Sequence, residues 1–121
     1  MKKSIVLALA AACLATPAFA ISYPVSGRYG LSAETRPGPI DCAGKRVIRF
    51  GANRRFDSGG GVPDYRIVDV IRNGTANFRI TEEFHTGQIK AQFRYRLQVI
   101  DTDRLELAMS PGGTLKLKRC G

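Results

Sequence analysis

His85 is the only histidine in the chain, and it follows two carboxylates, Glu82 and Glu83, in a segment that we expect to form a turn. A histidine beside carboxylates could bind a transition metal or transfer protons. A metal site would need further imidazole or thiolate ligands, and acid–base catalysis would need a partner that the sequence does not place nearby. We therefore expect a solvated turn at this position, with no metal site.

Ser58 precedes three consecutive glycines, Gly59–Gly61, and such a run could cradle a phosphate group. A phosphate-binding loop also needs a following Lys-Ser/Thr pair and the start of a helix. Residues 62–64 are Val-Pro-Asp and supply neither, so we interpret the run as a flexible connector. The aspartates lack the spacing of a calcium loop, and no nucleophile stands beside a base. We expect a protein that is not an enzyme and that uses no cofactor.

The N-terminus has the pattern of a bacterial secretory signal peptide. Residues 1–3 are Met-Lys-Lys, an apolar run follows from Ile5 to Leu14, and small residues occupy positions −3 and −1 of a cut after Ala20. A charged start, a short apolar run and a small-residue cleavage site define such leaders. The sequence predicts a signal peptide over 1–20 and a mature protein that works in the periplasm or is secreted.

Cys13 offers a second fate for the leader, which is lipidation and tethering to a membrane. Lipidation normally requires Leu or a similar residue three positions earlier, where Ala10 stands, so we favour cleavage. Cleavage removes Lys2 and Lys3 and lowers the formal net charge from +9 to +7. The remaining residues, 21–121, are expected to form one domain, and they contain no apolar run of the ~18 residues that a transmembrane helix needs.

Cys42 and Cys120 are the two cysteines of the predicted mature chain. Paired thiols in an exported domain are typical of a structural disulfide. The loop that they would enclose is long, and its closure stabilises by about 4 kcal/mol in the chain-entropy model. A redox role is disfavoured because the chain has no Cys-x-x-Cys pair, and two thiols with one histidine do not make a structural zinc site.

The segment 88–99 alternates polar and apolar residues over six steps, which is the period of a half-buried strand. Shorter alternating segments precede and follow it, and Asn73-Gly74 has the sequence of a tight hairpin turn. The pattern predicts seven strands with room for an eighth around Asp41 or Phe84, joined by short connections in an antiparallel meander. We expect an all-β antiparallel barrel of 7–8 strands, with a β-sandwich as the alternative.

Gly27-Arg28-Tyr29 in the first strand and Arg119 in the last resemble the Gly-x-Trp and closing-arginine pair of lipocalin-type barrels, with Tyr29 in place of the Trp. The resemblance implies a lipocalin-like barrel in which the arginine lies across the first-strand aromatic ring as a cation–π pair and closes one end. Small bacterial inhibitors of secreted proteases share this architecture. The resemblance therefore implies a non-enzymatic binding or inhibitor module.

Basic side chains recur on the predicted outer faces of three strands, and we call them the basic face: Arg79, Lys90, Arg94, Arg96, Lys116 and Lys118. Such a face could bind an anionic partner, namely lipopolysaccharide, a phospholipid surface or an acidic protein. It could equally provide solubility and protect strand edges. Nucleic acid is disfavoured by the compartment and by the inward phase of Phe93 and Tyr95.

We place the candidate binding loop at Asn53–Asp64, which carries Arg54, Arg55 and Phe56. The first hypothesis for function is an exported module that binds or inhibits an envelope or secreted protein through this loop. The second is a carrier of a small apolar or lipid ligand, since small residues at inward positions could leave room for one. The third is a protein that docks on anionic lipid or lipopolysaccharide through the basic face.

Overall fold

The computed structural model describes residues 21–121. The predicted signal peptide over 1–20, its cleavage after Ala20 and the alternative lipidation of Cys13 lie outside the described residues. Residues 21–121 form eight strands in chain order: β1 (Gly27–Leu31), β2 (Val47–Phe50), β3 (Arg54–Asp57), β4 (Asp64–Arg72), β5 (Asn77–Thr86), β6 (Ile89–Val99), β7 (Arg104–Met109) and β8 (Gly113–Arg119). In this part of the chain, no helix has the length and apolar character needed to cross a membrane.

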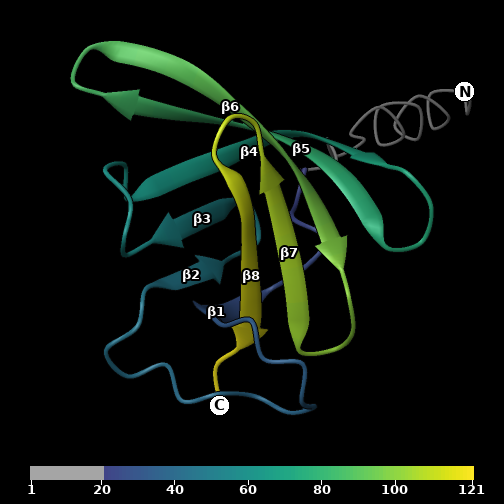
Figure 1. Cartoon of the computed structure of the whole chain (residues 1–121). Helices are drawn as coiled ribbons and strands as arrows, with labels where there is room; N and C mark the ends of the chain where they lie inside the picture. The colour runs from purple at the N-terminus through teal and green to yellow at the C-terminus, as the bar shows by residue number, and fades with distance from the viewer. Residues whose placement is uncertain (1–20) are drawn as a thin grey trace, which may run out of the picture.

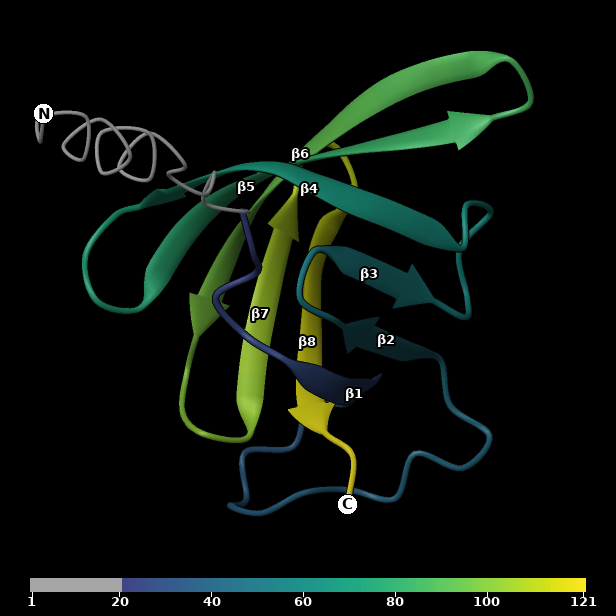
Figure 2. The same cartoon turned by 180° about the vertical axis from the view of Figure 1, so that it is seen from behind.

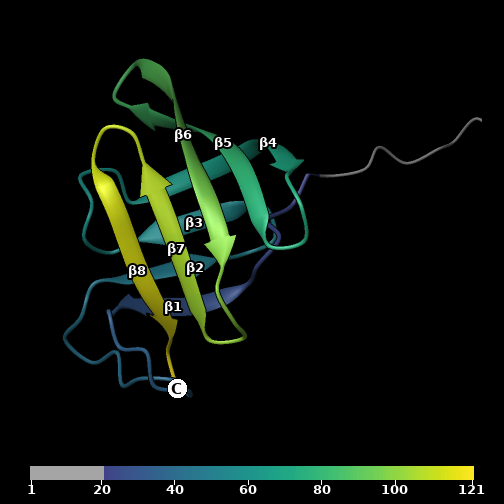
Figure 3. The same ribbon diagram turned by 45° about the vertical axis from the view of Figure 1, so that its right-hand side comes forward.

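The strands form a closed antiparallel barrel in which each pairs with its neighbour in sequence (Figure 1). The barrel closes where β1 pairs with β8, with Tyr29 opposite Arg119 and Leu31 opposite Leu117. Figure 3 shows β6, β7 and β8 side by side across the front of the barrel. Closure pairs the end of β8 with β1, so that neither strand is the edge of an open sheet, which is the usual advantage of a barrel. The all-β barrel prediction is confirmed, but the location of the eighth strand is wrong: it is β3 at Arg54–Asp57, whereas Asp41 lies outside the strands and Phe84 belongs to β5.

The barrel interior is filled by large side chains from every strand. Its buried apolar members are Tyr23, Tyr29, Ile48, Phe50, Ile67, Phe78, Ile80, Tyr95, Leu97, Leu105, Leu107 and Leu117. In β6 the inward phase is the predicted one, because Tyr95 and Leu97 are buried while Arg94 and Arg96 are exposed. Alternation along a strand thus separates a dry face from a wet one over most of the barrel.

The β4 segment 65–71 has a nearly continuous apolar sequence, and a bulge explains it. The register with β5 shifts between Ile67 and Asp69, so one extra residue enters β4. An extra residue reverses the phase of every residue after it. Ile67 before the bulge is buried, whereas Val70 after it packs on the core and Ile71 is 52 % exposed on the outside.

The long β1–β2 connection crosses one end of the barrel and is joined to the last residues of the chain (Figure 2). Cys42 and Cys120 form a disulfide, which confirms the predicted pairing. Ile40 forms a parallel bridge with Cys120 beside it. This connection also covers Lys118, whose ammonium group donates a hydrogen bond to the carbonyl of Arg36.

Tyr29 and Arg119 lie together at the β1–β8 closure. The guanidinium carbon is 4.8 Å from the ring centroid, and Nη2 donates to the tyrosine hydroxyl at 2.7 Å. Gly27 makes this approach possible, since a Cβ there would stand 2.7 Å from Arg119 Nη1, and its φ of +107° favours glycine. Burial raises the pKa of Tyr29, an effect that the nearby charge of Arg119 partly opposes.

Removing the disulfide is expected to destabilise the barrel without changing its topology. Cys42 and Cys120 are 78 residues apart, so the bond restricts much of the unfolded chain. The double variant Cys42→Ser, Cys120→Ser should lose about 2–4 kcal/mol in urea denaturation. Reduction of the unsubstituted protein should give the same loss. A free energy of unfolding that is unchanged by both treatments would contradict the structural role.

Candidate functional site

The predicted binding loop is largely a strand, and Arg55 is not on its surface. Residues 54–57 form β3, which pairs with both β2 and β4, so their side chains alternate between the outside and the interior. Arg55 points inward and is 1 % exposed, so the prediction of a binding role at the surface is wrong for this residue. Arg54 faces outward and pairs with Asp64 at 2.6 Å. Phe56 lies on the outside beneath Arg49, whose guanidinium carbon is 4.3 Å from the ring centroid.

Inside the barrel, Arg55 and Glu82 form a bidentate ion pair, with N···O distances of 2.8 and 2.7 Å. The hydroxyls of Tyr23 and Tyr95 each donate to the same Glu82 oxygen at 2.8 Å. Arg55 also lies over the ring of Tyr65, 4.0 Å from its centroid. We call Arg55, Glu82, Tyr23 and Tyr95 the buried polar cluster. Its carboxylate comes from β5 and not from a turn, because strand pairing continues to Thr86.

Within the buried polar cluster, the pKa values of Tyr23, Tyr95 and Arg55 are all raised. Burial is the largest cause that raises the pKa values of Tyr23 and Tyr95, and the charge of Glu82 raises them further. Burial alone would lower the pKa of Arg55, but its hydrogen bonds to Glu82 and the charge of that carboxylate raise it overall. Every buried side-chain nitrogen and oxygen within residues 21–121 has a hydrogen-bond partner. The cluster is therefore hydrogen-bonded internally, with the Glu82 carboxylate held by Arg55 and by both tyrosine hydroxyls.

Glu83 and His85 lie on strand β5, so the prediction that this segment forms a turn is wrong. Glu83 forms ion pairs with Arg66 at 2.8 Å and with Lys90 at 3.6 Å, and hydrogen bonding by Arg66 is the main cause that lowers its pKa. His85 is exposed on the same outer face. Within residues 21–121, no cluster of three or more His, Cys, Asp or Glu side chains is arranged to hold a metal ion.

The structure separates the six residues of the predicted basic face into different settings. Lys118 faces outward from β8 but is 1 % exposed, because the β1–β2 connection covers it; its assignment to an accessible face is corrected. Lys116 is exposed but stands opposite Glu106 of β7. Lys90 lies near the β5–β6 turn and pairs with Glu83. The other three members, Arg79, Arg94 and Arg96, come together.

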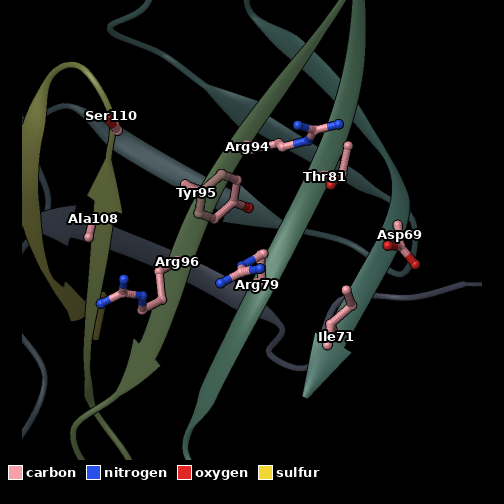
Figure 4. A pocket seen from close by; sticks show the side chains of 9 residues that line it. All are labelled: Asp69, Ile71, Arg79, Thr81, Arg94, Tyr95, Arg96, Ala108 and Ser110. Carbon is pink, nitrogen blue, oxygen red and sulfur yellow. The ribbon is translucent and has the colours of Figure 1, made fainter. Parts of the chain in front are cut away.

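Arg79, Arg94 and Arg96 line a surface groove of about 490 Å³ on the outer face of β4–β7, which we call the arginine groove (Figure 4). Arg79 of β5 stands directly opposite Arg96 of β6, and Arg94 stands opposite Thr81. The remaining wall comes from neighbouring strands and from the start of the β7–β8 turn: Asp69, Ile71, Thr81, Tyr95, Ala108 and Ser110. These wall residues were not predicted from the sequence.

Within residues 21–121, none of the three guanidinium groups of the arginine groove forms an ion pair, although the Asp69 carboxylate lies on the same groove wall. The ion pairs found within residues 21–121 engage other basic side chains: Arg36, Arg46, Arg54, Arg55, Arg66, Lys90, Arg104 and Arg119. Like charges directly opposite each other on neighbouring strands destabilise a sheet. The Arg79–Arg96 pair therefore carries a repulsion that a bound anion would relieve.

Comparison with known proteins identifies no relative: no family model matches the chain, and neither a curated protein nor a solved structure is similar to it. The resemblance of Gly27, Tyr29 and Arg119 to the lipocalin-type pattern stays a prediction. The closed barrel itself is shown by the strand pairing.

Substituting only one partner of the buried ion pair should destabilise the barrel more than substituting both. Arg55→Met leaves the Glu82 carboxylate buried without its cation, and we expect a loss of about 3–5 kcal/mol in the free energy of unfolding. The double variant Arg55→Met, Glu82→Leu should recover part of this loss. Arg54→Met, at the exposed pair with Asp64, is the matched control and should lose less than about 1 kcal/mol. Additive losses in urea denaturation would refute the coupling.

The buried tyrosines make stability fall at alkaline pH. Because burial raises their pKa values, Tyr23 and Tyr95 stay protonated in the folded protein above pH 10.0, the ordinary value, while the unfolded chain ionises. The native state then binds more protons, so the free energy of unfolding decreases as pH rises, by about 1.4 kcal/mol per pH unit for each tyrosine.

Tyr23→Phe should flatten this alkaline decline by the contribution of one tyrosine. Denaturation midpoints measured between neutral and strongly alkaline pH, together with tyrosinate absorbance, would test it. If the free energy of unfolding falls with pH at the same rate in both proteins, the pKa of Tyr23 is not raised by folding.

Proposed function

We propose that this chain is an exported, non-enzymatic binding protein that recognises an anionic partner through the arginine groove. The observation that carries the proposal is the Arg79–Arg96 pair, which has no ion-pair partner within residues 21–121, with Arg94 beside it. Guanidinium groups bind carboxylates and phosphates through paired N–H donors, which suits them to anion recognition. The groove offers donors and charge, and its wall contains no nucleophile–base pair.

The partner that we favour is an envelope or secreted protein with an acidic surface. This keeps the first hypothesis for function but moves its contact site from Arg54–Phe56 to the arginine groove, since β3 turns Arg55 into the core. The carrier hypothesis is weakened, because a ligand inside the barrel would have to displace the buried polar cluster and the surrounding aromatic side chains.

An anionic lipid surface or lipopolysaccharide is the second candidate partner. Ile71, 52 % exposed on the groove wall, favours it, because an apolar side chain beside cations suits the boundary between headgroups and acyl chains. The same guanidinium groups would bind its phosphates. The two partners differ in whether binding requires a bilayer.

The experiment compares two charge reversals of equal size. Arg79→Glu with Arg96→Glu changes the groove. Arg28→Glu with Arg49→Glu changes another cross-strand arginine pair without an ion-pair partner among residues 21–121, on β1 and β2, which has no third arginine in its surface pocket. Binding to polyglutamate and to vesicles that contain phosphatidylglycerol should weaken with salt. We expect the groove variant to lose about tenfold or more in affinity, equivalent to ~1.4 kcal/mol, and the control less than threefold.

Three results would refute the proposal. The first is that the unsubstituted protein binds neither probe at low salt, and the second is that the two double variants lose affinity equally. The third is that the affinity of the unsubstituted protein does not change with salt concentration. Tight binding to vesicles with none to polyglutamate would select the lipid candidate over the protein candidate.

A further inference from the structure

Part of the edge of β6 stays open, on the side that faces β7. β6 pairs with β5 along its full length, from Ile89 to Gln98, but it pairs with β7 only from Tyr95 to Val99. Within residues 21–121, the segment Ile89–Arg94 therefore has a strand on one side only. Figure 1 and Figure 3 show the reason, since the turn end of the β5–β6 hairpin extends beyond the barrel wall. We call Ile89–Arg94 the open edge.

The backbone groups that face away from β5 can be identified from the hairpin. The two-residue turn Gly87-Gln88 joins Thr86 and Ile89, and such turns close on a pair that exchanges both backbone hydrogen bonds. Hydrogen-bonded and non-hydrogen-bonded pairs then alternate along the ladder. Ile89 and every second residue after it direct their backbone N–H and C=O groups toward β5. The N–H and C=O groups of the residues between them, Lys90, Gln92 and Arg94, point to the open side.

The side chains along the open edge have a matching repeat. Lys90 and Arg94 lie on the outer phase of the open edge and are exposed, with Gln92 between them, and Arg96 continues this phase where β6 pairs with β7. Alternate residues of a strand are roughly 6.6 Å apart, and an added strand repeats its own side chains at the same spacing. The open edge ends at the arginine groove, where Ala108 and Ser110 of the neighbouring wall lie across from Arg94 and Arg96 (Figure 4).

We propose that the open edge binds an extended acidic segment of a partner protein as an added strand, with carboxylates at alternate positions facing Lys90 and Arg94. The proposal rests on the proposed function and specifies its partner. Main-chain hydrogen bonds from Lys90, Gln92 and Arg94 provide the pairing, as in other cases of strand addition. The cations provide selectivity for acidic sequences and against basic ones.

A second copy of this chain fits the open edge less well. Antiparallel pairing of two copies about Gln92 places Lys90 of each copy opposite Arg94 of the other. Like charges directly opposite each other destabilise such a pair. The charges that disfavour self-association therefore favour an acidic strand, and this complementarity identifies the occupant.

The test uses two short synthetic peptides of equal composition and charge. One alternates glutamate with threonine, and the other carries its glutamates in one block. The alternating peptide should bind at least tenfold more tightly, and it should slow amide hydrogen exchange at Lys90, Gln92 and Arg94 in the full barrel. Phosphatidylglycerol vesicles serve as the lipid comparison and should not slow exchange at these amides.

Two substitutions at one position isolate the backbone contribution. Gln92→Pro removes an amide on the open side, where an edge strand tolerates proline, while Gln92→Ala removes the same side chain and keeps the amide. The alanine variant should retain affinity for the alternating peptide within about twofold, and the proline variant should lose tenfold or more. Circular dichroism and the urea midpoint check that both fold, and the exchange measurement on the unsubstituted protein decides the question if the proline variant does not.

The outcomes separate this proposal from the proposed function. Equal affinity for both peptides without exchange protection overturns strand addition and leaves an anion-binding groove. Protection that appears on self-association without peptide, at rising protein concentration, identifies a second copy as the occupant and also overturns the proposal. Failure of polyglutamate, peptides and vesicles alike to bind overturns both.

Discussion

The buried ion pair between Arg55 and Glu82 is the interaction on which the rest of the barrel depends. It joins β3 to β5 across the interior, and the hydroxyls of Tyr23 and Tyr95 attach the N-terminal segment and β6 to the same carboxylate. Removing two charges from water costs several kcal/mol for each ion, and only saturated hydrogen bonding offsets that cost. The cluster is saturated, and it occupies the space that a ligand-carrying barrel would leave for its ligand. The proposed binding site is therefore on the outer surface.

On that outer surface, the distribution of charge is uneven in an informative way. Carboxylates neutralise Arg54 and Arg66, whereas Arg79, Arg94 and Arg96 gather in a groove without an ion-pair partner among residues 21–121. Solubility alone would be served by cations that are spread apart. Gathering three of them around a direct cross-strand pair opposes folding, and the contribution becomes favourable when an anion is bound. The open edge of β6 lies beside this groove, so its unpaired backbone groups and the arginine side chains are exposed close to each other.

Local patterns predicted the barrel well because its strands alternate cleanly. The phase of β6, the pairing of Cys42 with Cys120 and the outward direction of Arg79, Arg94 and Arg96 all follow from residue order. Arg55 could not be placed from the sequence, since β3 is short, precedes the Gly59–Gly61 run, and buries an ion whose partner is 27 residues away. Lys118 has the predicted phase and is nevertheless covered, because a distant connection crosses it. The arginines of the groove were predicted to face outward, but the groove itself was not predicted. Its wall comes from several strands that become neighbours only in the closed barrel.

The closure between β1 and β8 has a consequence for how the molecule is made. The first and last strands are neighbours in space, so the barrel cannot be completed until β8 has been synthesised. Until then β1 presents an unpaired side, and the half-built sheet is exposed to wrong pairing with other chains, as slow, long-range β topologies are. The intermediate hairpins, β5 with β6 above all, can form early from local contacts. The pairing of β1 with β8 therefore has to wait for the last strand, whereas the hairpins between neighbouring strands do not.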